Sequence, residues 1–250
     1  MKRRILTFLL TGAFIGLAGL SARAQLKIMP FGDSVTANGS SPESSYRYWL
    51  YQYLVNAGFD VDFIGPESGV ADGSPANSDF DQNYAGGDGM DSSSALFYMQ
   101  QRGLATYNGG PDVVLLDMGA NDFNTGQKNR DILAQTKANL EQIVENFYAA
   151  NPNVIIILAE STPWVALNGR KEKNFMSHLK GIQSQVVSAE KRAGVKIMRV
   201  NLWAGFNPRK DTKDGTHPNL IGEKMIAKKY FNKFKNNRRL RPFWKAAHGK

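Results

Sequence analysis

The sequence predicts an α/β fold, a three-layer α/β/α sandwich with a central, mainly parallel sheet. The main observation is that short apolar runs alternate with helical stretches along most of the 250 residues. The second is that the clearest runs, such as "PDVVLLDMG", are continuously apolar, as in strands covered on both faces. The third is that residues 25–250 are numerous enough for one domain with a full core.

The first half of the chain contains two expected strands and two expected helices. A buried strand is expected at 26–31 and a second at 61–65. Large residues at helical spacing predict a helix over 44–58, and "SSSALFYMQQ" predicts one over 92–101 with a serine cap. Residues 66–89 are rich in Gly, Ser, Asp and Asn and indicate a long loop, a kind of segment that is often functional.

The second half repeats the alternation more regularly. Its amphipathic and apolar segments have the lengths typical of βα units. In order, they predict a strand over 111–119, a helix over 129–151, a strand over 153–160, a helix over 173–193, a strand over 195–200 and a final helix over 220–235.

The first 24 residues have the pattern of a secretory signal. A basic start, "MKRR", precedes an apolar stretch, and Ala22 and Ala24 stand at the small-residue positions before a cleavage site. The alternative is an uncleaved membrane anchor, although a spanning helix needs about 20 apolar residues. We therefore expect residues 1–24 to be removed near Ala24, leaving a periplasmic or secreted protein.

The formal net charge of +9 misrepresents the domain. Residues 1–24 hold four basic residues and 228–250 hold nine, so 25–227 has 31 − 4 − 9 = 18 basic residues against 22 acidic ones. The sequence thus predicts one folded domain over 25–235 and a basic tail over 236–250. The tail is either a solvated extension or a contact for acidic polysaccharide or an anionic membrane surface. Nucleic acid is not expected as a partner, and the oligomeric state is not predicted.

Thiol and metal chemistry have little support in the composition. The chain has no cysteine and only three histidines, with no His-x-x-x-His pair. Neither a metal nor another cofactor is expected.

Polar residues follow several predicted strands at the point where each strand ends. Gly32, Asp33 and Ser34 follow the first strand, Asn121 follows the strand over 111–119, and "KDGTHPN" follows the last. Because right-handed crossovers place the carboxyl ends of parallel strands at one edge, these side chains should lie together. A hydroxyl, an imidazole, a carboxylate and an amide are the groups that acyl transfer needs.

Each group has a definable role in that chemistry. The Ser34 hydroxyl is a weak nucleophile that needs a base, which His217 can supply. Asp214 can hold the other imidazole nitrogen and fix its tautomer. The oxyanion needs donors, and the Asn121 amide and the N–H groups of Ser34 and Gly89 are candidates. Taken alone, Ser34 and Asn121 could instead be helix caps, and Asp214 a turn residue.

Four short blocks give a resemblance to a known family. "FGDSVT", a glycine in "GGDGMDS", "GAND" and "DGTHPN" occur in the order of the blocks of the SGNH hydrolases, also called GDSL esterases. The resemblance implies an SGNH-hydrolase-like, flavodoxin-like fold with Ser34 as nucleophile, Asp214 and His217 as its partners, and Gly89 and Asn121 in the oxyanion hole. Gly86 and Gly87 offer alternative alignments for Gly89.

"KIMPFGDSVT", "YRYWLYQYLVNAGFDVDFIG" and "PDVVLLDMGANDF" resemble the branch that holds secreted carbohydrate esterases, including acetyl xylan esterases. That likeness implies a serine esterase acting on small acyl esters of carbohydrate, acetyl esters first. Members often have His-Glu-Gly before the second-block glycine, where this chain reads Tyr84-Ala85-Gly86. The alternatives are a lipid, thioester or aryl esterase of the same fold, or a non-catalytic carbohydrate-binding or surface-adhesion protein.

Four aromatic residues could stack on a sugar: Trp164, Tyr84, Phe123 and Trp203. Trp164, in "STPW" just after a strand, is the favoured one, while core or rim packing is the usual role of such residues. Asp33 and Asp122 are expected to support the site through hydrogen bonds rather than to act in the chemistry.

Overall fold

The computed structural model describes residues 25–243, apart from 38–43, 72 and 166. The predicted signal peptide, 1–24, and the last seven residues of the tail lie outside the described residues. In the described part of the chain, no helix is both long enough and apolar enough to cross a bilayer.

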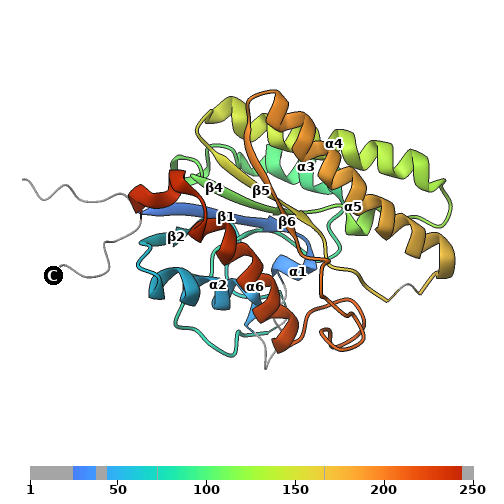
Figure 1. Ribbon diagram of the computed structural model, residues 1–250, viewed down its shortest axis with the longest axis horizontal. Coiled ribbons are helices and arrows are strands. Elements are labelled where there is room, and N and C mark those ends of the chain that lie inside the picture. The colour runs from blue at the N-terminus through green and yellow to red at the C-terminus, as the bar shows by residue number, and fades with distance from the viewer. Residues whose placement is uncertain (1–24, 38–43, 72, 166, 244–250) are drawn as a thin grey trace, which may run out of the picture.

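One sheet forms the centre of the molecule (Figure 1). Its strands run in the order β2-β1-β4-β5-β6, with the short β3 beside β1, and every pairing is parallel. The expectation of a mainly parallel sheet is confirmed. The strands are β1 Leu26–Gly32, β2 Val61–Phe63, β3 Ala85–Gly86, β4 Val113–Asp117, β5 Ile155–Glu160 and β6 Lys196–Asn201.

Helices follow the strands much as the periodicity predicts. The α-helices are α1 Ser34–Ala37, α2 Ser45–Asn56, α3 Ser92–Arg102, α4 Asn129–Ala150, α5 Gly169–Arg192 and α6 Leu220–Lys235. Short 3₁₀ turns are η1 Tyr107–Gly109, η2 Ala120–Asp122 and η3 Arg238–Phe243. The predicted serine cap of α3 is wrong, because the side chain of Asp91 accepts the bond from the Ser94 N–H.

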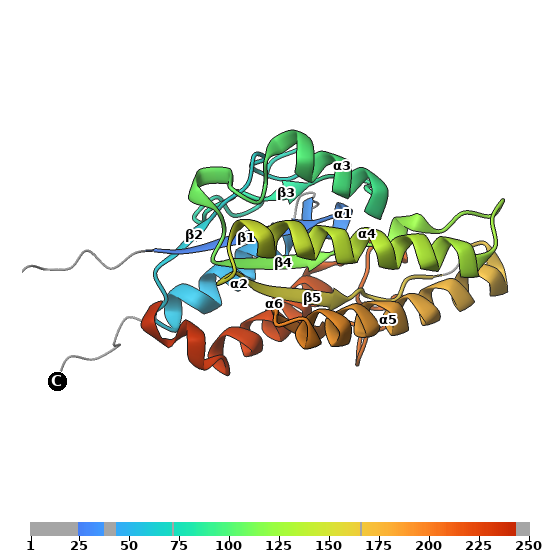
Figure 2. The same ribbon diagram turned by 90° about the horizontal axis from the view of Figure 1, so that it is seen from above.

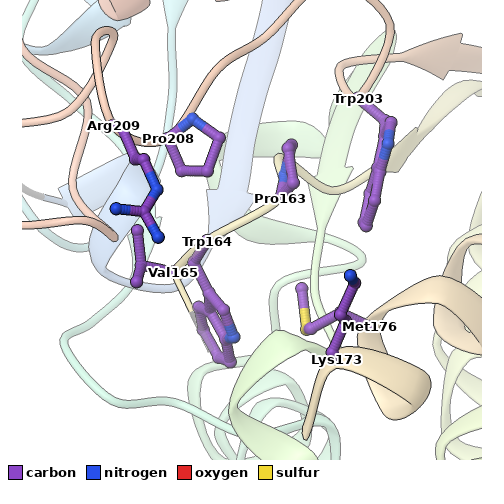
Figure 3. A pocket seen from close by; sticks show the side chains of 8 residues that line it. All are labelled: Pro163, Trp164, Val165, Lys173, Met176, Trp203, Pro208 and Arg209. Carbon is purple, nitrogen blue, oxygen red and sulfur yellow. The ribbon is translucent and has the colours of Figure 1, made fainter. Parts of the chain in front are cut away.

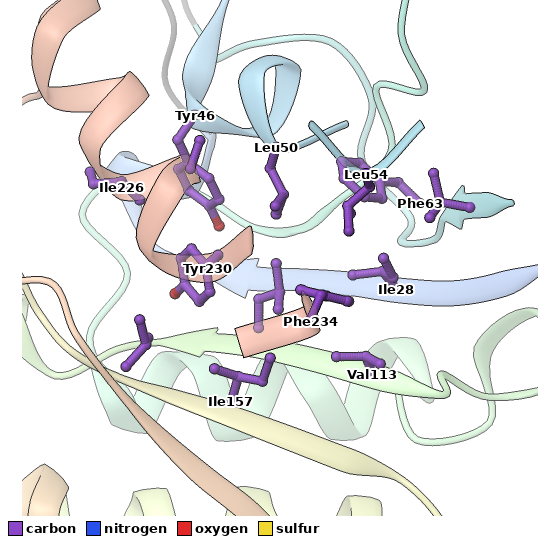
Figure 4. Close-up of a cluster of buried hydrophobic side chains, with 14 of the residues drawn as sticks. Ile28, Tyr46, Leu50, Leu54, Phe63, Val113, Ile157, Ile226, Tyr230 and Phe234 are labelled. Carbon is purple, nitrogen blue, oxygen red and sulfur yellow. The ribbon is translucent and has the colours of Figure 1, made fainter. Parts of the chain in front are cut away.

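The two faces of the sheet carry separate helix layers. Alternate residues of each strand point to opposite faces, so Ile28 packs under α2 and α6 while Met29 packs under α3, α4 and α5. Figure 4 shows Tyr46 and Leu50 of α2 and Tyr230 of α6 on the same side of β1, the strand that carries Ile28. Figures 1 and 2 show α3, α4 and α5 side by side on the other face. This is the predicted three-layer sandwich.

The strand order changes direction between β1 and β4. The chain passes from β1 to β2 on one side of this point, and from β4 to β5 and β6 on the other. In open parallel sheets the crevice at such a point is the usual place for a ligand. The carboxyl ends of the two strands are level there, because Gly32 lies opposite Asp117. The residues that follow these strands, Ser34 and Asn121, are therefore neighbours in space.

A buried arginine fixes the long loop between β2 and β3. Arg47 has no exposed surface, and its guanidinium donates to the carbonyls of Thr36, Gln82 and Gly69. Burial lowers the pKa of Arg47 to about 10, which leaves it charged at neutral pH. Arg47 thereby ties α1 to the loop.

Tyr84 is part of the same structural unit. It is only 6% exposed, it pairs with Glu67 in a β-bridge, and the Arg47 guanidinium lies 4.2 Å from the centre of its ring. A ring that is buried and covered in this way is placed for packing rather than for stacking on a sugar. We therefore remove Tyr84 from the candidate substrate-binding residues.

Part of the predicted tail belongs to the domain. The helix α6 ends at Lys235 as expected, but the chain continues into η3, where Leu240 is 1% exposed and joins the core beneath α6. The boundary at 235 is therefore too early. An apolar residue between "NNRR" and "RPF" was the available signal.

Candidate active site

Ser34 stands at a turn that only glycine allows. A Cβ on Gly32 would lie 2.2 Å from the Thr36 hydroxyl oxygen and 2.9 Å from the Asp117 carbonyl oxygen, so β1 can enter α1 only without a side chain there. The Asp33 carbonyl accepts from the Thr36 and Ala37 N–H groups and completes the turn. Ser34 then begins α1 at the carboxyl edge of the sheet, with 8% of its surface exposed.

Ser34, His217 and Asp214 form one chain of hydrogen bonds. The Ser34 Oγ lies 3.0 Å from His217 Nε2, and His217 Nδ1 lies 2.6 Å from Asp214 Oδ2. The two partners come from the loop between β6 and α6, which reaches the same end of the sheet as α1 (Figure 1). The predicted serine, histidine and aspartate are thus brought together across 183 positions of sequence.

The other oxygen of Asp214 holds the loop itself. Oδ1 accepts from the Thr216 N–H at 2.9 Å and the His217 N–H at 2.7 Å. Partial burial acts to raise the pKa of Asp214, but the hydrogen bonds from the His217 side chain and from the two backbone N–H groups outweigh it and lower the pKa to about 2. Asp214 is therefore ionised throughout the pH range in which an imidazole can act as a base.

Three donor groups belong to the segments that adjoin Ser34. The Asn121 amide, in η2 after β4, donates to the Asp33 carboxyl at 3.3 Å and to the Met90 carbonyl at 3.2 Å. Both bonds are long, so they orient the amide without holding it strongly. Among the described residues, none accepts from the N–H of Ser34 or of Gly89, so both are available to an oxyanion.

The three neighbouring glycines have different surroundings. Gly86 pairs with Gly32, and a Cβ there would lie 1.8 Å from the Gly32 carbonyl oxygen. The Gly87 N–H already donates to that same oxygen at 3.3 Å. Gly89 has φ +65° in the following turn and nothing within 4 Å of an added Cβ. Gly89 is therefore the glycine of this group whose N–H has no acceptor among the residues that the structure describes.

Two carboxyl groups are buried beneath the nucleophile. Asp33 is 3% exposed and Asp117 2% exposed. Burial and the charge of Asp117 raise the pKa of Asp33 to about 8, and burial raises that of Asp117 to about 6 against an opposing bond from the Ser161 hydroxyl. The expected support from Asp33 is present, since its carboxyl accepts from the Val35 N–H and from Asn121.

This pair predicts a pH-dependent stability. Groups whose pKa is raised on folding bind more protons folded than unfolded, so their stabilisation is complete below about pH 4 and is lost as the pH rises towards 8. Asp117→Asn keeps an acceptor for Ser161 and removes one charge. The free energy of unfolding of the wild type should fall between pH 5 and pH 8. We expect the fall in Asp117→Asn to be smaller by at least about 1 kcal/mol.

The check is urea unfolding of both proteins at pH 5 and pH 8. The control is Asp131→Asn, which removes an exposed carboxylate on α4. Equal pH dependence in Asp117→Asn and wild type would contradict the account of the buried pair.

Asp122 is structural, as expected. Its carboxylate accepts from the Ser92 N–H at 2.9 Å, from the Ser92 hydroxyl and from the Thr136 hydroxyl at 3.0 Å. It therefore anchors α3 and α4 to the turn that carries Asn121.

A pocket of about 360 Å³ borders the loop of Asp214 and His217 (Figure 3). Trp164 and Trp203 line it with two prolines, a valine and a methionine, and Lys173 and Arg209 are its charged residues. Val165, which follows Trp164, donates from its N–H to the Gly215 carbonyl at 2.7 Å. Trp164 is thus placed beside the catalytic loop, and its indole N–H is buried without an acceptor among the described residues.

Phe123 does not line this pocket. It is half-buried and packs on Phe175 with ring centres 5.6 Å apart. Trp164 and Trp203 pack against the same small cluster at the ends of α4 and α5.

Several residues that shape the site were not predicted. Arg47 could have been suspected as a charge on an otherwise aromatic helix face, "YRYWLYQY". Asp117 directly follows the buried run "VVLL", a position where a carboxyl must be desolvated. Lys173 and Arg209 could not be identified from the sequence as pocket residues. Exposed cations are common, and the pocket forms only when distant segments come together in the fold.

The fold and the hydrogen-bonded site define a class of protein, the serine hydrolases of carboxylic esters. Among the described residues, no group of three histidine, aspartate or glutamate side chains could hold a metal ion. The sequence model of the family described as GDSL-like Lipase/Acylhydrolase matches residues 28–230. The chain belongs to that family, which confirms the resemblance seen in the sequence blocks.

Individual relatives agree with this assignment. A multidomain esterase of Ruminococcus flavefaciens is 25% identical over 228 residues, which are 83% of this chain and 28% of the relative. The chain thus spans about a quarter of that protein. A family 3 carbohydrate esterase of Clostridium thermocellum is 28% identical with a TM-score of 0.67, covering 84% of this chain and 94% of the other. A family 3 carbohydrate esterase of Talaromyces cellulolyticus shares the fold at 22% identity, with a TM-score of 0.67 over 84% of this chain and 97% of the other.

Proposed function

We propose that this protein is a serine esterase that hydrolyses small acyl esters of carbohydrate, acetyl esters first, through an acyl-enzyme intermediate. The observation that supports this best is the chain from Ser34 Oγ through His217 to Asp214, with bonds of 3.0 and 2.6 Å, at the carboxyl edge of the sheet. A base within hydrogen-bonding distance of a hydroxyl and an ionised carboxylate behind that base are what nucleophilic activation requires.

In the first step Ser34 Oγ attacks the ester carbonyl carbon while His217 Nε2 takes the hydroxyl proton. Asp214 holds the proton on Nδ1, which leaves Nε2 free to accept, and it stabilises the imidazolium that forms. The carbonyl oxygen becomes an oxyanion, which the N–H groups of Ser34 and Gly89 and the Asn121 amide stabilise. His217 then gives the proton to the leaving alcohol, and the acyl group remains on Ser34.

In the second step water replaces the alcohol. His217 takes a proton from the water as it attacks the acyl carbon, and the same donors stabilise the second oxyanion. When the bond to Ser34 breaks, His217 returns the proton to Oγ and the acid leaves. The two steps use only these side chains, the two backbone N–H groups and water.

The preference for acetylated carbohydrate has two supports. The first is the likeness to carbohydrate esterases, of which the Clostridium thermocellum protein is 28% identical. The second is the pocket with two tryptophans beside the catalytic loop, since indole rings suit the apolar faces of sugars. A lipid, thioester or aryl esterase of this fold remains the alternative, as does a carbohydrate-binding protein without turnover.

The substrate proposal is tested by acetate release from acetylated xylan. A panel of 4-nitrophenyl esters from acetyl to octanoyl then measures chain-length preference, because pocket length sets the apolar contact that each added carbon can make. We expect release from the xylan and a fall in kcat/KM beyond about four carbons. A preference for long chains would move the assignment to the lipid esterases, and glycan binding without turnover to the binding proteins.

We expect Asn121→Ala to lower kcat by about 10²-fold, because the amide is one of three oxyanion donors. Because a donor to the oxyanion acts in the transition state, KM for 4-nitrophenyl acetate should change little. Asn124→Ala, at an exposed residue of the following loop, is the control. A change in KM with kcat intact would instead assign Asn121 to substrate binding.

We further propose that the protein is exported and cleaved near Ala24, and that the basic residues from Lys228 onward can contact acidic polysaccharide or an anionic surface. The support is the charge and apolar pattern of residues 1–24 and the nine basic residues of 228–250. N-terminal sequencing of the protein from a secreting host tests the first point.

A further inference from the structure

The charged residues that line the pocket beside the catalytic loop are both basic, whereas the domain as a whole is acidic. Lys173 of α5 and Arg209 of the β6–α6 loop lie on different sides of Trp164 (Figure 3). Of the described residues that line the pocket, none is acidic. The body of the chain, by contrast, has 18 basic and 22 acidic residues over 25–227. Two cations therefore line one pocket of a domain that has more acidic than basic residues.

The described part of the chain gives these two cations no carboxylate to pair with. Among the described residues, neither Lys173 nor Arg209 has an ion-pair partner. The nearby Lys180, by comparison, lies 5.6 Å from the centre of the Trp203 ring. A guanidinium and an ammonium without partners, on the rim of a pocket, favour an anionic group of a ligand.

The pocket is attached to the catalytic residues. Its wall at Val165 is bonded to Gly215, two residues before His217, through the 2.7 Å bond from the Val165 N–H. A Cβ on Gly215 would lie 3.1 Å from the Val165 side chain, so the two segments are in close contact. The Thr212 hydroxyl joins both parts of the loop, since it donates to the Pro208 carbonyl and accepts from the Gly215 N–H. A ligand in the pocket therefore lies against the segment that carries Asp214 and His217.

Tryptophan faces and unpaired cations together identify the ligand class. Apolar sugar faces stack on indole rings, and a carboxylate binds well to a guanidinium. We propose that the pocket holds a uronate, a sugar unit that bears a carboxylate, within the acylated glycan. The inference rests on the proposed esterase function, because it concerns the part of the substrate next to the ester that Ser34 attacks.

The test compares two acetylated xylo-oligosaccharides of equal acetyl content, one with a glucuronate branch and one without. We expect KM to be about tenfold lower for the branched substrate. The double variant Lys173→Gln/Arg209→Gln should lose this difference in KM. Sodium chloride should reduce the difference in the wild type, because exposed charge pairs are screened.

The matched control is Lys191→Gln/Lys210→Gln, which removes the same charge from exposed positions of α5 and the same loop outside the pocket. The inference is overturned if the wild type treats both substrates alike, or if the Lys173/Arg209 double variant keeps the preference. Hydrolysis of 4-nitrophenyl acetate would stand in that case and leave the proposed function intact.

If no ester is hydrolysed, the proposed function fails and calorimetry still tests the pocket. The deacetylated branched oligosaccharide should then bind the wild type about tenfold more tightly than the Lys173/Arg209 double variant. Equal affinity in the two proteins, or no binding to either, would overturn the inference independently of catalysis.

Discussion

Ser34→Ala is expected to lower kcat for ester hydrolysis by between about 10⁴-fold and 10⁶-fold. The hydroxyl is the only group in the proposed mechanism that forms a bond to the substrate, and a methyl group cannot replace it. The remaining activity comes from binding and from the oxyanion donors, which the substitution leaves in place.

The same substitution should hardly affect the fold. Ser34 Oγ has one hydrogen bond among the described residues, to His217 Nε2 at 3.0 Å, and losing it should change the free energy of unfolding by about 1 kcal/mol or less. Ser94→Ala, at an exposed serine of α3, is the matched control for activity and stability. A Ser34→Ala enzyme with full activity would show that another group is the nucleophile.

Asp214→Asn is expected to lower kcat by about 10⁴-fold with little loss of structure. An asparagine can keep the acceptor that the Thr216 and His217 N–H groups use, at 2.9 and 2.7 Å, so the loop should retain its conformation. Its NH₂ group then faces His217 Nδ1 in place of the carboxylate oxygen. A donor at that position forces the imidazole proton onto Nε2, and Nε2 can no longer accept the proton of Ser34.

The measurement is kcat on 4-nitrophenyl acetate together with a crystal structure of the variant. Asp131→Asn serves again as the control for loss of an exposed carboxylate. If Asp214→Asn kept more than about a tenth of the wild-type kcat, the carboxylate would be holding the loop and not the tautomer.

The fold could be predicted from the sequence because each of its layers leaves a local pattern. The continuous apolar run at 113–116 becomes the body of β4, which is buried on both faces, and the periodic segment at 129–151 becomes α4 almost to the residue. Helix ends were less certain. The helix α5 begins at Gly169 rather than at 173, since its first turn, "GRKE", is polar and has no apolar spacing to mark it.

The site was predictable to the extent that its residues follow strands. Ser34 and Asn121 follow adjacent parallel strands, so topology alone brings them together. His217 and Asp214 are only three residues apart in the sequence, so the hydrogen bond between their side chains is local. What could not be predicted depends on side chains from distant segments: the burial of Tyr84 under Arg47, the Asp33–Asp117 pair, and the cations beside Trp164.

The central claim is that Ser34 becomes acylated, and its most direct test is covalent labelling. The wild-type protein is treated with a fluorophosphonate, which reacts with activated serines, and the modified peptide is located by mass spectrometry. The account predicts a single label on Ser34, complete loss of esterase activity, and no label in His217→Gln, which lacks the base. A label on another serine that abolishes activity, with Ser34 unmodified, would contradict it.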